Sequence, residues 1–198
     1  MFRSDRNNGR LGGGVMLYVK SDSQSVEFWP NTQFPEQIWC VVNDKCNKDY
    51  YVGTIYRTPN DDIYGSQAAG ILRDLLSEMH SENIVLMGDF NYGNIDWNTL
   101  QPGLSSSANT TLFLDYIESN CLTQHVMEPT RGTNILDLVI TKDPDIVHEV
   151  QLLDSLAVSD HWMITWKVDI NRPTVRRKKV FDYNKADYEA IKQRLHAL

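Results

Sequence analysis

The sequence of 198 residues has no apolar run long enough to cross a membrane, and its first residues lack the apolar core of a signal peptide. It has only three cysteines, Cys40, Cys46 and Cys121, an odd number without the spacing of a zinc site or a disulfide framework. We therefore expect reduced thiols, no membrane partner and no secretion. The expected location is intracellular, either nuclear or cytoplasmic.

Positive charge is scarce, because 19 Lys and Arg stand against 26 Asp and Glu, giving a net charge of −7. Affinity for phosphate backbones comes mainly from Lys and Arg that displace counterions, so a general polyanion-binding surface is disfavoured. A nuclease is not excluded. Acidic residues gathered at a metal site lower the net charge, while the bound cation reverses the local field.

A nucleotide phosphate loop is also missing. Gly12, Gly13 and Gly14 resemble one, but no Gly-Lys-Ser/Thr follows, and residues 15–19 have the pattern of a strand. No helix N-terminus is therefore expected there to hold a phosphate. The glycines predict a tight turn into a strand.

What is present is a composition of 41% hydrophobic and 23% charged residues, enough to bury a sizeable core in one domain with a tail. Apolar patterns alternate between strand and helix periods, which indicates an α/β fold with a sheet-rich core. The expected helices lie within residues 62–82 and from about Ser107 or Asn109 to 117. The expected strands cover residues 15–19, 37–42, 50–56, 84–87, 124–126, 134–141, 146–153 and 162–168, and residues 21–36 are expected to form a polar linker.

The apolar run 84–87 stops at Gly88 and is followed by Asp89 and Asn91. Continuous apolarity predicts a strand buried on both faces, and the two polar side chains, two residues apart, point the same way. Their oxygens suit a hard cation or a phosphate-bound water. The alternative is a simple turn, because Asp and Asn side chains hydrogen-bond the local backbone.

Other strand ends carry polar side chains of the same kind. Pro59 ends the strand that leads to Tyr56 and Arg57, and Asp160-His161 lies between the last two strands. Asp137 lies within an apolar strand, where an unpaired carboxylate costs several kcal/mol. Its partner is expected to be Arg131, a histidine or a metal. Metal ligation, water activation and charge stabilisation would converge here, as a phosphodiester hydrolase requires.

An ordered set of short motifs makes the pattern specific. They are Gly12-Gly13-Gly14-Val15, Tyr56-Arg57-Thr58-Pro59-Asn60, Gly88-Asp89-Phe90-Asn91, Pro129-Thr130-Arg131, Leu136-Asp137-Leu138-Val139 and Ser159-Asp160-His161. This set resembles the endonuclease/exonuclease/phosphatase superfamily, and more narrowly the apurinic-like endonuclease domain of non-LTR retrotransposons. The resemblance covers nearly all of residues 10–168.

The resemblance implies a four-layer α/β sandwich of two mainly antiparallel sheets with helices outside, and magnesium-dependent cleavage of DNA, with manganese as a possible substitute. It implies that Asp89 and Asn91 orient and activate the attacking water and that Tyr56 supports the transition state. His161 would contact the scissile phosphate with Asp137 paired to it.

The remaining roles implied by the resemblance concern the metal and the DNA. Asp160 would help Asp89 to hold the metal or the water. The DNA-contacting residues would be Arg57, Asn60, Thr130 and Arg131. Residues 1–169 would form the endonuclease domain, and residues 170–198, a basic linker and a helix, would lead toward a reverse transcriptase that is a partner in the full-length element.

One departure concerns the start of the chain. Superfamily members open with strands that carry an asparagine and a metal-ligating glutamate, so the chain is expected to be truncated at its N-terminus, with its first strands missing. Glu27 and Glu36 are expected to lie too late, after the wrong strand, to replace that ligand. Two alternatives therefore stay open: a catalytically inactive remnant or interaction module, and a phosphatase of the same fold acting on a phosphorylated lipid or small molecule.

Overall fold

The computed structural model describes residues 1–6, 13–21, 23–44, 46, 48–59, 67–79, 83–104 and 106–170. The expected basic linker and helix, from residue 171 onward, and the predicted DNA contact Asn60 lie outside the described residues. No helix within the described ranges is both long and apolar enough to span a membrane.

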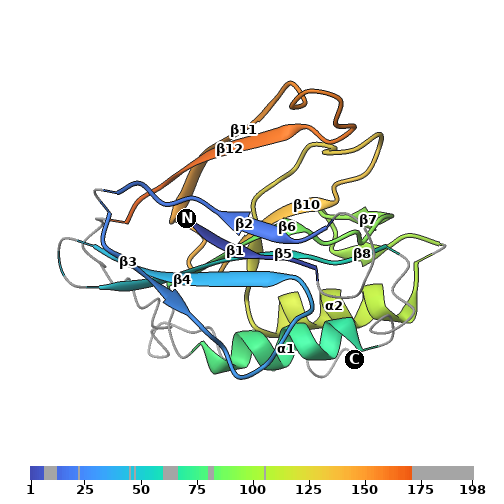
Figure 1. The fold of residues 1–198 in the computed structure, drawn as a ribbon. Helices are drawn as coiled ribbons and strands as arrows, with labels where there is room; N and C mark the ends of the chain where they lie inside the picture. Colours follow the sequence, from blue (N-terminus) through green and yellow to red (C-terminus); the bar gives the residue numbers. More distant parts are fainter. Residues whose placement is uncertain are drawn as a thin grey trace, which may run out of the picture.

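A six-stranded sheet forms the centre of the molecule (Figure 1). Its strands, in spatial order, are β3 (Ser25–Phe28), β4 (Gln37–Asn43), β5 (Asp49–Tyr56), β6 (Ile84–Asp89), β10 (Asp137–Thr141) and β9 (Thr123–Gln124). Neighbours pair antiparallel except β5 and β6, which run parallel. Parallel neighbours need a crossover, and helix α1 (Ala68–Glu78) provides it.

Both described helices cover one face of this sheet (Figure 1). Helix α2 (Ala108–Ser119) begins at the predicted cap Ser107, whose hydroxyl accepts a hydrogen bond from the N–H of Thr110 at 3.3 Å. Alternate residues of the central strands, such as Leu86 and Leu138, are buried against Phe113 and its neighbours. The helix side therefore takes every second residue of each strand.

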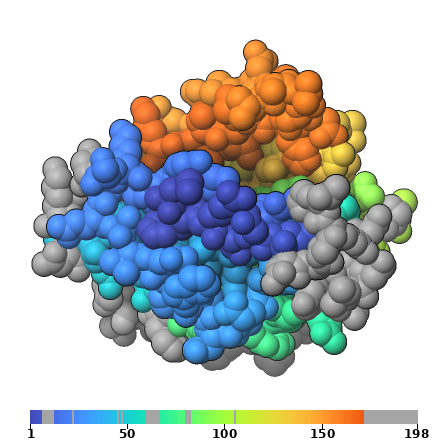
Figure 2. All heavy atoms as spheres, in the orientation of Figure 1, coloured from blue at the N-terminus to red at the C-terminus, as the bar shows by residue number. Residues whose placement is uncertain are grey.

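Two separate two-stranded ribbons cover the opposite face (Figures 1 and 2). One pairs β1 (Phe2–Ser4) with β2 (Val15–Leu17), and the other pairs β11 (Val147–Leu153) with β12 (Met163–Val168). Val85 and Val139 are buried beneath the β11–β12 ribbon, while Ile38 and Cys40 are buried beside Leu17. The central strands are therefore apolar on both faces, as predicted for residues 84–87. A small hairpin, β7 (Ile95–Asp96) with β8 (Gln101–Pro102), lies apart.

This architecture confirms the α/β fold class with a mainly antiparallel sheet and helices outside it. In the described residues the second sheet is represented by the two ribbons, and both helices lie on the far side of the main sheet. Strands β1 and β3 were not predicted, because each has only three or four residues, too few for a periodic pattern. The range 21–36, expected to be a polar linker, therefore contains a strand of the main sheet, β3.

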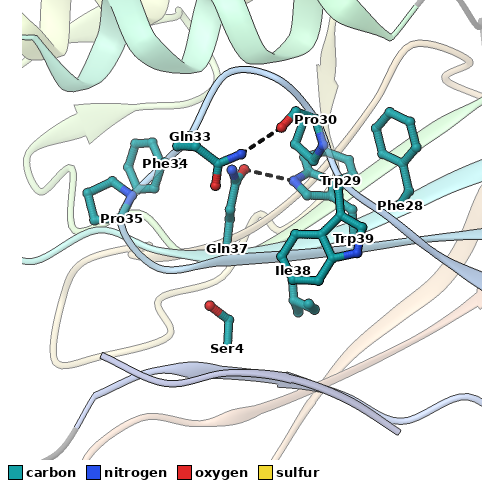
Figure 3. A pocket seen from close by; sticks show the side chains of 10 residues that line it. All are labelled: Ser4, Phe28, Trp29, Pro30, Gln33, Phe34, Pro35, Gln37, Ile38 and Trp39. Atoms are coloured by element: carbon teal, nitrogen blue, oxygen red, sulfur yellow. Dashed lines mark hydrogen bonds between the residues drawn. The ribbon is translucent and has the colours of Figure 1, made fainter. Parts of the chain in front are cut away.

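The segment between β3 and β4 encloses a small cavity of about 60 Å³ (Figure 3). Hydrogen bonds fix this segment: Gln33 donates to the Pro30 carbonyl at 2.6 Å, and Gln37 of β4 donates to the Thr32 carbonyl at 3.0 Å. The cavity is lined by Ser4, Phe28, Trp29, Pro30, Gln33, Phe34, Pro35, Gln37, Ile38 and Trp39. Pro35 and Gln37 flank Glu36, so the same packing fixes the position of that carboxylate.

Candidate active site

The strand register aligns four polar residues in a row across neighbouring strands of the main sheet, at one end of these strands. Tyr56 is the partner of Asp89 in the parallel pair, and Asp89 is the partner of Asp137 in the antiparallel pair. Glu36 comes next, because Gln37 pairs with Ile55 and the N–H of Tyr56 donates to the Glu36 carbonyl at 2.9 Å. Paired residues share a face, and we call Glu36, Tyr56, Asp89 and Asp137 the rim row.

The turn after β6 fixes the Asp89 carboxylate. Asn91 has a φ of 48°, in the left-handed region that asparagine tolerates. Its N–H donates to Asp89 Oδ1 at 3.0 Å, and its Nδ2 donates to Asp89 Oδ2 at 2.9 Å and to the Arg57 carbonyl at 2.8 Å. Asn91 therefore makes the turn and also orients Asp89. The turn expected from the sequence and the candidate site involve the same residues.

Asp137 pairs with His161, and a histidine was one of the three kinds of partner expected from the sequence. The Nδ1 of His161 lies 2.7 Å from Asp137 Oδ2, and its Nε2 lies 4.0 Å from Asp89 Oδ2. The loop that carries it is held by a hydrogen bond from the Trp162 N–H to the Thr130 carbonyl at 2.8 Å. A carboxylate on Nδ1 favours the tautomer that leaves Nε2 free to face a substrate.

Asp89, Asp137 and His161 could together hold a metal ion, because one ligand atom of each lies within 4.8 Å of the others. Carboxylate oxygens suit hard cations such as Mg²⁺, and an added imidazole nitrogen is also accepted by Mn²⁺. Asp160, a predicted metal ligand, is not part of this group. It is exposed and pairs with Arg131 through contacts of 2.7 and 2.8 Å. That guanidinium lowers the pKa of Asp160.

Burial raises the pKa of Asp89 to about 6 from an ordinary value of 3.8, and the nearby charge of Asp137 adds to the rise. Hydrogen bonds from Asn91 and the proximity of His161 act in the opposite direction. Desolvation and a like charge both disfavour the charged carboxylate. The two carboxylates therefore repel each other when both are ionised, and a bound cation would offset this repulsion.

A polar groove of about 290 Å³ is lined by residues 94–98, which follow Asn91 in the chain, and by residues between 127 and 135, which precede Asp137. Its lining residues are Asn94, Ile95, Asp96, Trp97, Asn98, Met127, Pro129, Thr133, Asn134 and Ile135.

A family model described as endonuclease-reverse transcriptase matches residues 50–165, which is more than half of the chain. The matched range contains Tyr56, Asp89, Asn91, Asp137 and His161, which the structure brings to one edge of the sheet. The chain belongs to the endonuclease-reverse transcriptase family. It is therefore a member of the endonuclease/exonuclease/phosphatase superfamily.

A solved endonuclease domain shares the fold of this family member, and two further solved structures match it more weakly. The endonuclease domain of TRAS1, a telomere-specific non-LTR retrotransposon, matches 76% of this chain and 69% of its own, with 13% identity and a TM-score of 0.59. A superfamily protein from Leptotrichia buccalis C-1013-b matches 74% of this chain and 61% of its own, at 15% identity and a TM-score of 0.46. One from Bacteroides thetaiotaomicron matches 73% and 62%, at 12% identity and a TM-score of 0.39. No curated protein matches the chain.

Two predicted DNA contacts of this endonuclease-family chain are buried beneath the site. Arg57 is 8% exposed, lies over the Tyr92 ring at 4.2 Å, and donates to the carbonyls of Phe90 and Asn91 at 3.2 and 3.1 Å. Thr130 is fully buried. In this structure both support the loops that carry the site, and a direct contact with DNA stays a prediction. Arg131 is exposed beside Asp160.

The hydroxyl of Thr130 supports the start of β10. It accepts hydrogen bonds from the N–H groups of Leu136 and Asp137 at 3.0 and 3.1 Å. Thr130→Val keeps the shape but leaves one buried and one partly buried N–H donor unpaired, so we expect a loss of about 2–4 kcal/mol in the free energy of unfolding, measured by urea denaturation. Thr165→Val, at an exposed position of β12, should change it by less than about 0.5 kcal/mol. Equal effects of the two changes would contradict this role.

Glu36 was expected to lie too late in the chain to replace the missing metal ligand, and its place in the rim row was not predicted. It directly precedes β4 and lies beside Tyr56. Its carboxylate is already engaged by Arg6 at 2.7 Å and by the N–H of Gly14 at 2.5 Å, and it does not belong to the metal-competent group found among the described residues. The signal that could have revealed it is the β4–β5 hairpin, whose register sets Glu36 against Tyr56.

Proposed function

We propose that this chain is a DNA endonuclease that hydrolyses phosphodiester bonds and depends on a divalent metal. Its family membership supports a nuclease of the endonuclease/exonuclease/phosphatase superfamily. The observation that carries the proposal is His161, held at 2.7 Å by Asp137 with Asp89 4.0 Å from its other nitrogen. A paired histidine beside a second carboxylate provides a hydrogen-bond donor and a proton acceptor within one site.

Each side chain then has a distinct role. Asp89, oriented by Asn91, accepts the proton of the attacking water. In its protonated form His161 donates from Nε2 to a phosphate oxygen, and Asp137, which accepts from Nδ1, orients the ring and stabilises that imidazolium. Tyr56, the neighbour of Asp89 in the sheet, offers its hydroxyl to the charge that develops in the transition state.

Magnesium is the proposed cofactor, with manganese as a substitute, and Asp89 and Asp137 are the oxygen ligands best placed to hold it. The fit rests on the donor set, in which two carboxylates and one imidazole nitrogen offer ligand atoms within 4.8 Å of one another. When bound, such an ion neutralises phosphate charge. Asp160, as a further metal or water ligand, would first have to leave Arg131.

Family membership supports a proposal for the substrate and the partner, and the location is proposed with them. The substrate is DNA nicked at a target site, and the proposed partner is a reverse transcriptase domain in a full-length retroelement. The proposed location is intracellular, nuclear or cytoplasmic, without a membrane partner.

Nicking of supercoiled plasmid in the presence of Mg²⁺ tests the function. We expect His161→Ala to lower the rate by about 100-fold or more, the typical effect of losing one transition-state donor. The control is His148→Ala, because His148 lies at the other end of the β11–β12 ribbon and pairs with Asp169. Chelation of the metal should also stop nicking. Nicking that survives in His161→Ala, or phosphate release from a phosphorylated lipid without nicking, would overturn the assignment.

A further inference from the structure

The two ribbons deliver one cationic or ionisable side chain each to opposite ends of the rim row. His161 comes from the β11–β12 connection and pairs with Asp137 at 2.7 Å. Arg6 follows β1, and its Nε donates to Glu36 Oε1, also at 2.7 Å. The row therefore has a basic side chain bound to the carboxylate at each end, with Tyr56 and Asp89 between them.

The position of Arg6 is closely determined. Its side chain is 14% exposed and that of Glu36 is 5% exposed. The second oxygen of Glu36 accepts the Gly14 N–H at 2.5 Å, and the Arg6 guanidinium carbon lies 5.6 Å from the centre of the Tyr56 ring. A Cβ at Gly13 would come within 2.3 Å of that carbon, so the glycine turn leaves room for the guanidinium. Glu36 and Tyr56 raise the pKa of Arg6, so its charge is retained.

The substrate of the proposed reaction is an anion approaching a site that contains two carboxylates. The other arginines described nearby are engaged, since Arg57 bonds carbonyl oxygens beneath the site and Arg131 pairs with the exposed Asp160. Arg6 donates from Nε to Glu36, and a guanidinium has four further N–H donors that match phosphate geometry. It lies beside Tyr56, which neighbours Asp89 in the sheet.

We propose that Arg6 binds a backbone phosphate of the DNA strand at the Tyr56 end of the rim row, and that Glu36 is its positioning residue. This inference rests on the proposed function and adds a substrate-binding residue to it. Glu36 and Asp137 are three strand spacings apart, roughly 14 Å. With about 3.4 Å of rise per nucleotide, the bound phosphate lies within a few nucleotides of the one that faces His161.

Binding is tested separately from cleavage by placing the variants in a His161→Ala background and measuring fluorescence anisotropy with a labelled DNA duplex and Mg²⁺. We expect Arg6→Gln to raise the Kd for DNA about 10-fold and to reduce the slope of log Kd against log salt concentration by about 1. Arg6→Lys should recover part of the loss. The matched control is Arg3→Gln, because Arg3 lies on β1, three residues before Arg6, is exposed, and pairs with Asp5.

Steady-state nicking by the otherwise native enzyme distinguishes binding from a structural role. Loss of a phosphate contact should raise KM several-fold with kcat nearly unchanged, and Glu36→Gln should produce the same pattern in weaker form. Unchanged Kd, salt slope and KM in Arg6→Gln would overturn the inference, and so would a fall in kcat alone with a lowered unfolding midpoint. If Arg6 variants do not fold, Glu36→Gln alone decides. Absence of DNA binding and nicking in the wild type would instead refute the proposed function itself.

Discussion

Replacing Asp89 with asparagine is expected to abolish nicking and yet to stabilise the metal-free protein above pH 6. The loss of activity should reach about 100-fold or more, because the variant lacks the proton acceptor and a metal-binding oxygen. The gain in stability has a separate cause. Burial and the charge of Asp137 raise the pKa of Asp89 from 3.8 to about 6, so the folded state holds its proton more tightly than the unfolded chain.

The sign of the pH dependence follows from that direction. Between pH 4 and 6 the folded protein binds more protons than the unfolded chain, so its stability falls as the pH rises through this window. Ionising Asp89 therefore costs the fold up to about 3 kcal/mol at pH 7, at about 1.4 kcal/mol per pH unit. Asparagine avoids this cost but disturbs the hydrogen bonds from Asn91, so a net gain of about 1–2 kcal/mol is expected.

Thermal melts in EDTA between pH 3.5 and 8 measure the effect. Asp89→Asn should melt about 2–6 °C above the wild type at pH 7–8. This advantage should be lost toward pH 3.5, where Asp89 keeps its proton in the folded wild type and only the disturbed hydrogen bonds from Asn91 separate the two proteins. Asp115→Asn, at an exposed position of α2, serves as the control for charge removal. A melting temperature at or below that of the wild type at pH 8 would show that the hydrogen bonds from Asn91 outweigh the cost of burial.

The sequence was sufficient for the centre of the fold because its strands are buried on both faces. Continuous apolarity marks residues 84–87 and the strand that contains Asp137. Such a run is typical of a strand that is buried on both faces. The same apolarity made Asp137 anomalous, and the required partner proved to be His161. A carboxylate in an otherwise apolar strand was therefore the most informative single signal for the site.

The features of the site that the sequence did not predict depend on strand pairing and on burial in three dimensions. Glu36 enters the rim row only because the β4–β5 hairpin sets it beside Tyr56, and Arg6 reaches it from a three-residue strand too short for a periodic pattern. A motif cannot show whether a polar residue faces the solvent. Arg57 and Thr130 were therefore predicted to contact DNA at the surface, although their side chains hydrogen-bond backbone groups beneath the site.

Gly88→Ala is expected to be the most disruptive single substitution near the site. Gly88 has a φ of 138°, which only glycine adopts without strain, and a Cβ there would lie 1.9 Å from the carbonyl oxygen of Ile55. Ile55 is its partner on β5, so the methyl group would push β5 and β6 apart. Backbone strain and overpacking together should cost about 3 kcal/mol or more in the free energy of unfolding.

Activity should fall with it, because the same strand pair aligns Tyr56 with Asp89 and holds the hydrogen bond from the Arg57 N–H to the Asp89 carbonyl at 2.9 Å. A displacement of about 1 Å at such a site can cost about 100-fold in rate. Urea unfolding and plasmid nicking measure the two effects. Gly70→Ala is the control, since Gly70 lies in α1 with no atom within 4 Å of an added Cβ, and it should stabilise the helix by up to about 1 kcal/mol. Wild-type stability and nicking in Gly88→Ala would mean that the strand end tolerates a side chain and that the close approach of β5 to β6 does not set the geometry of the site.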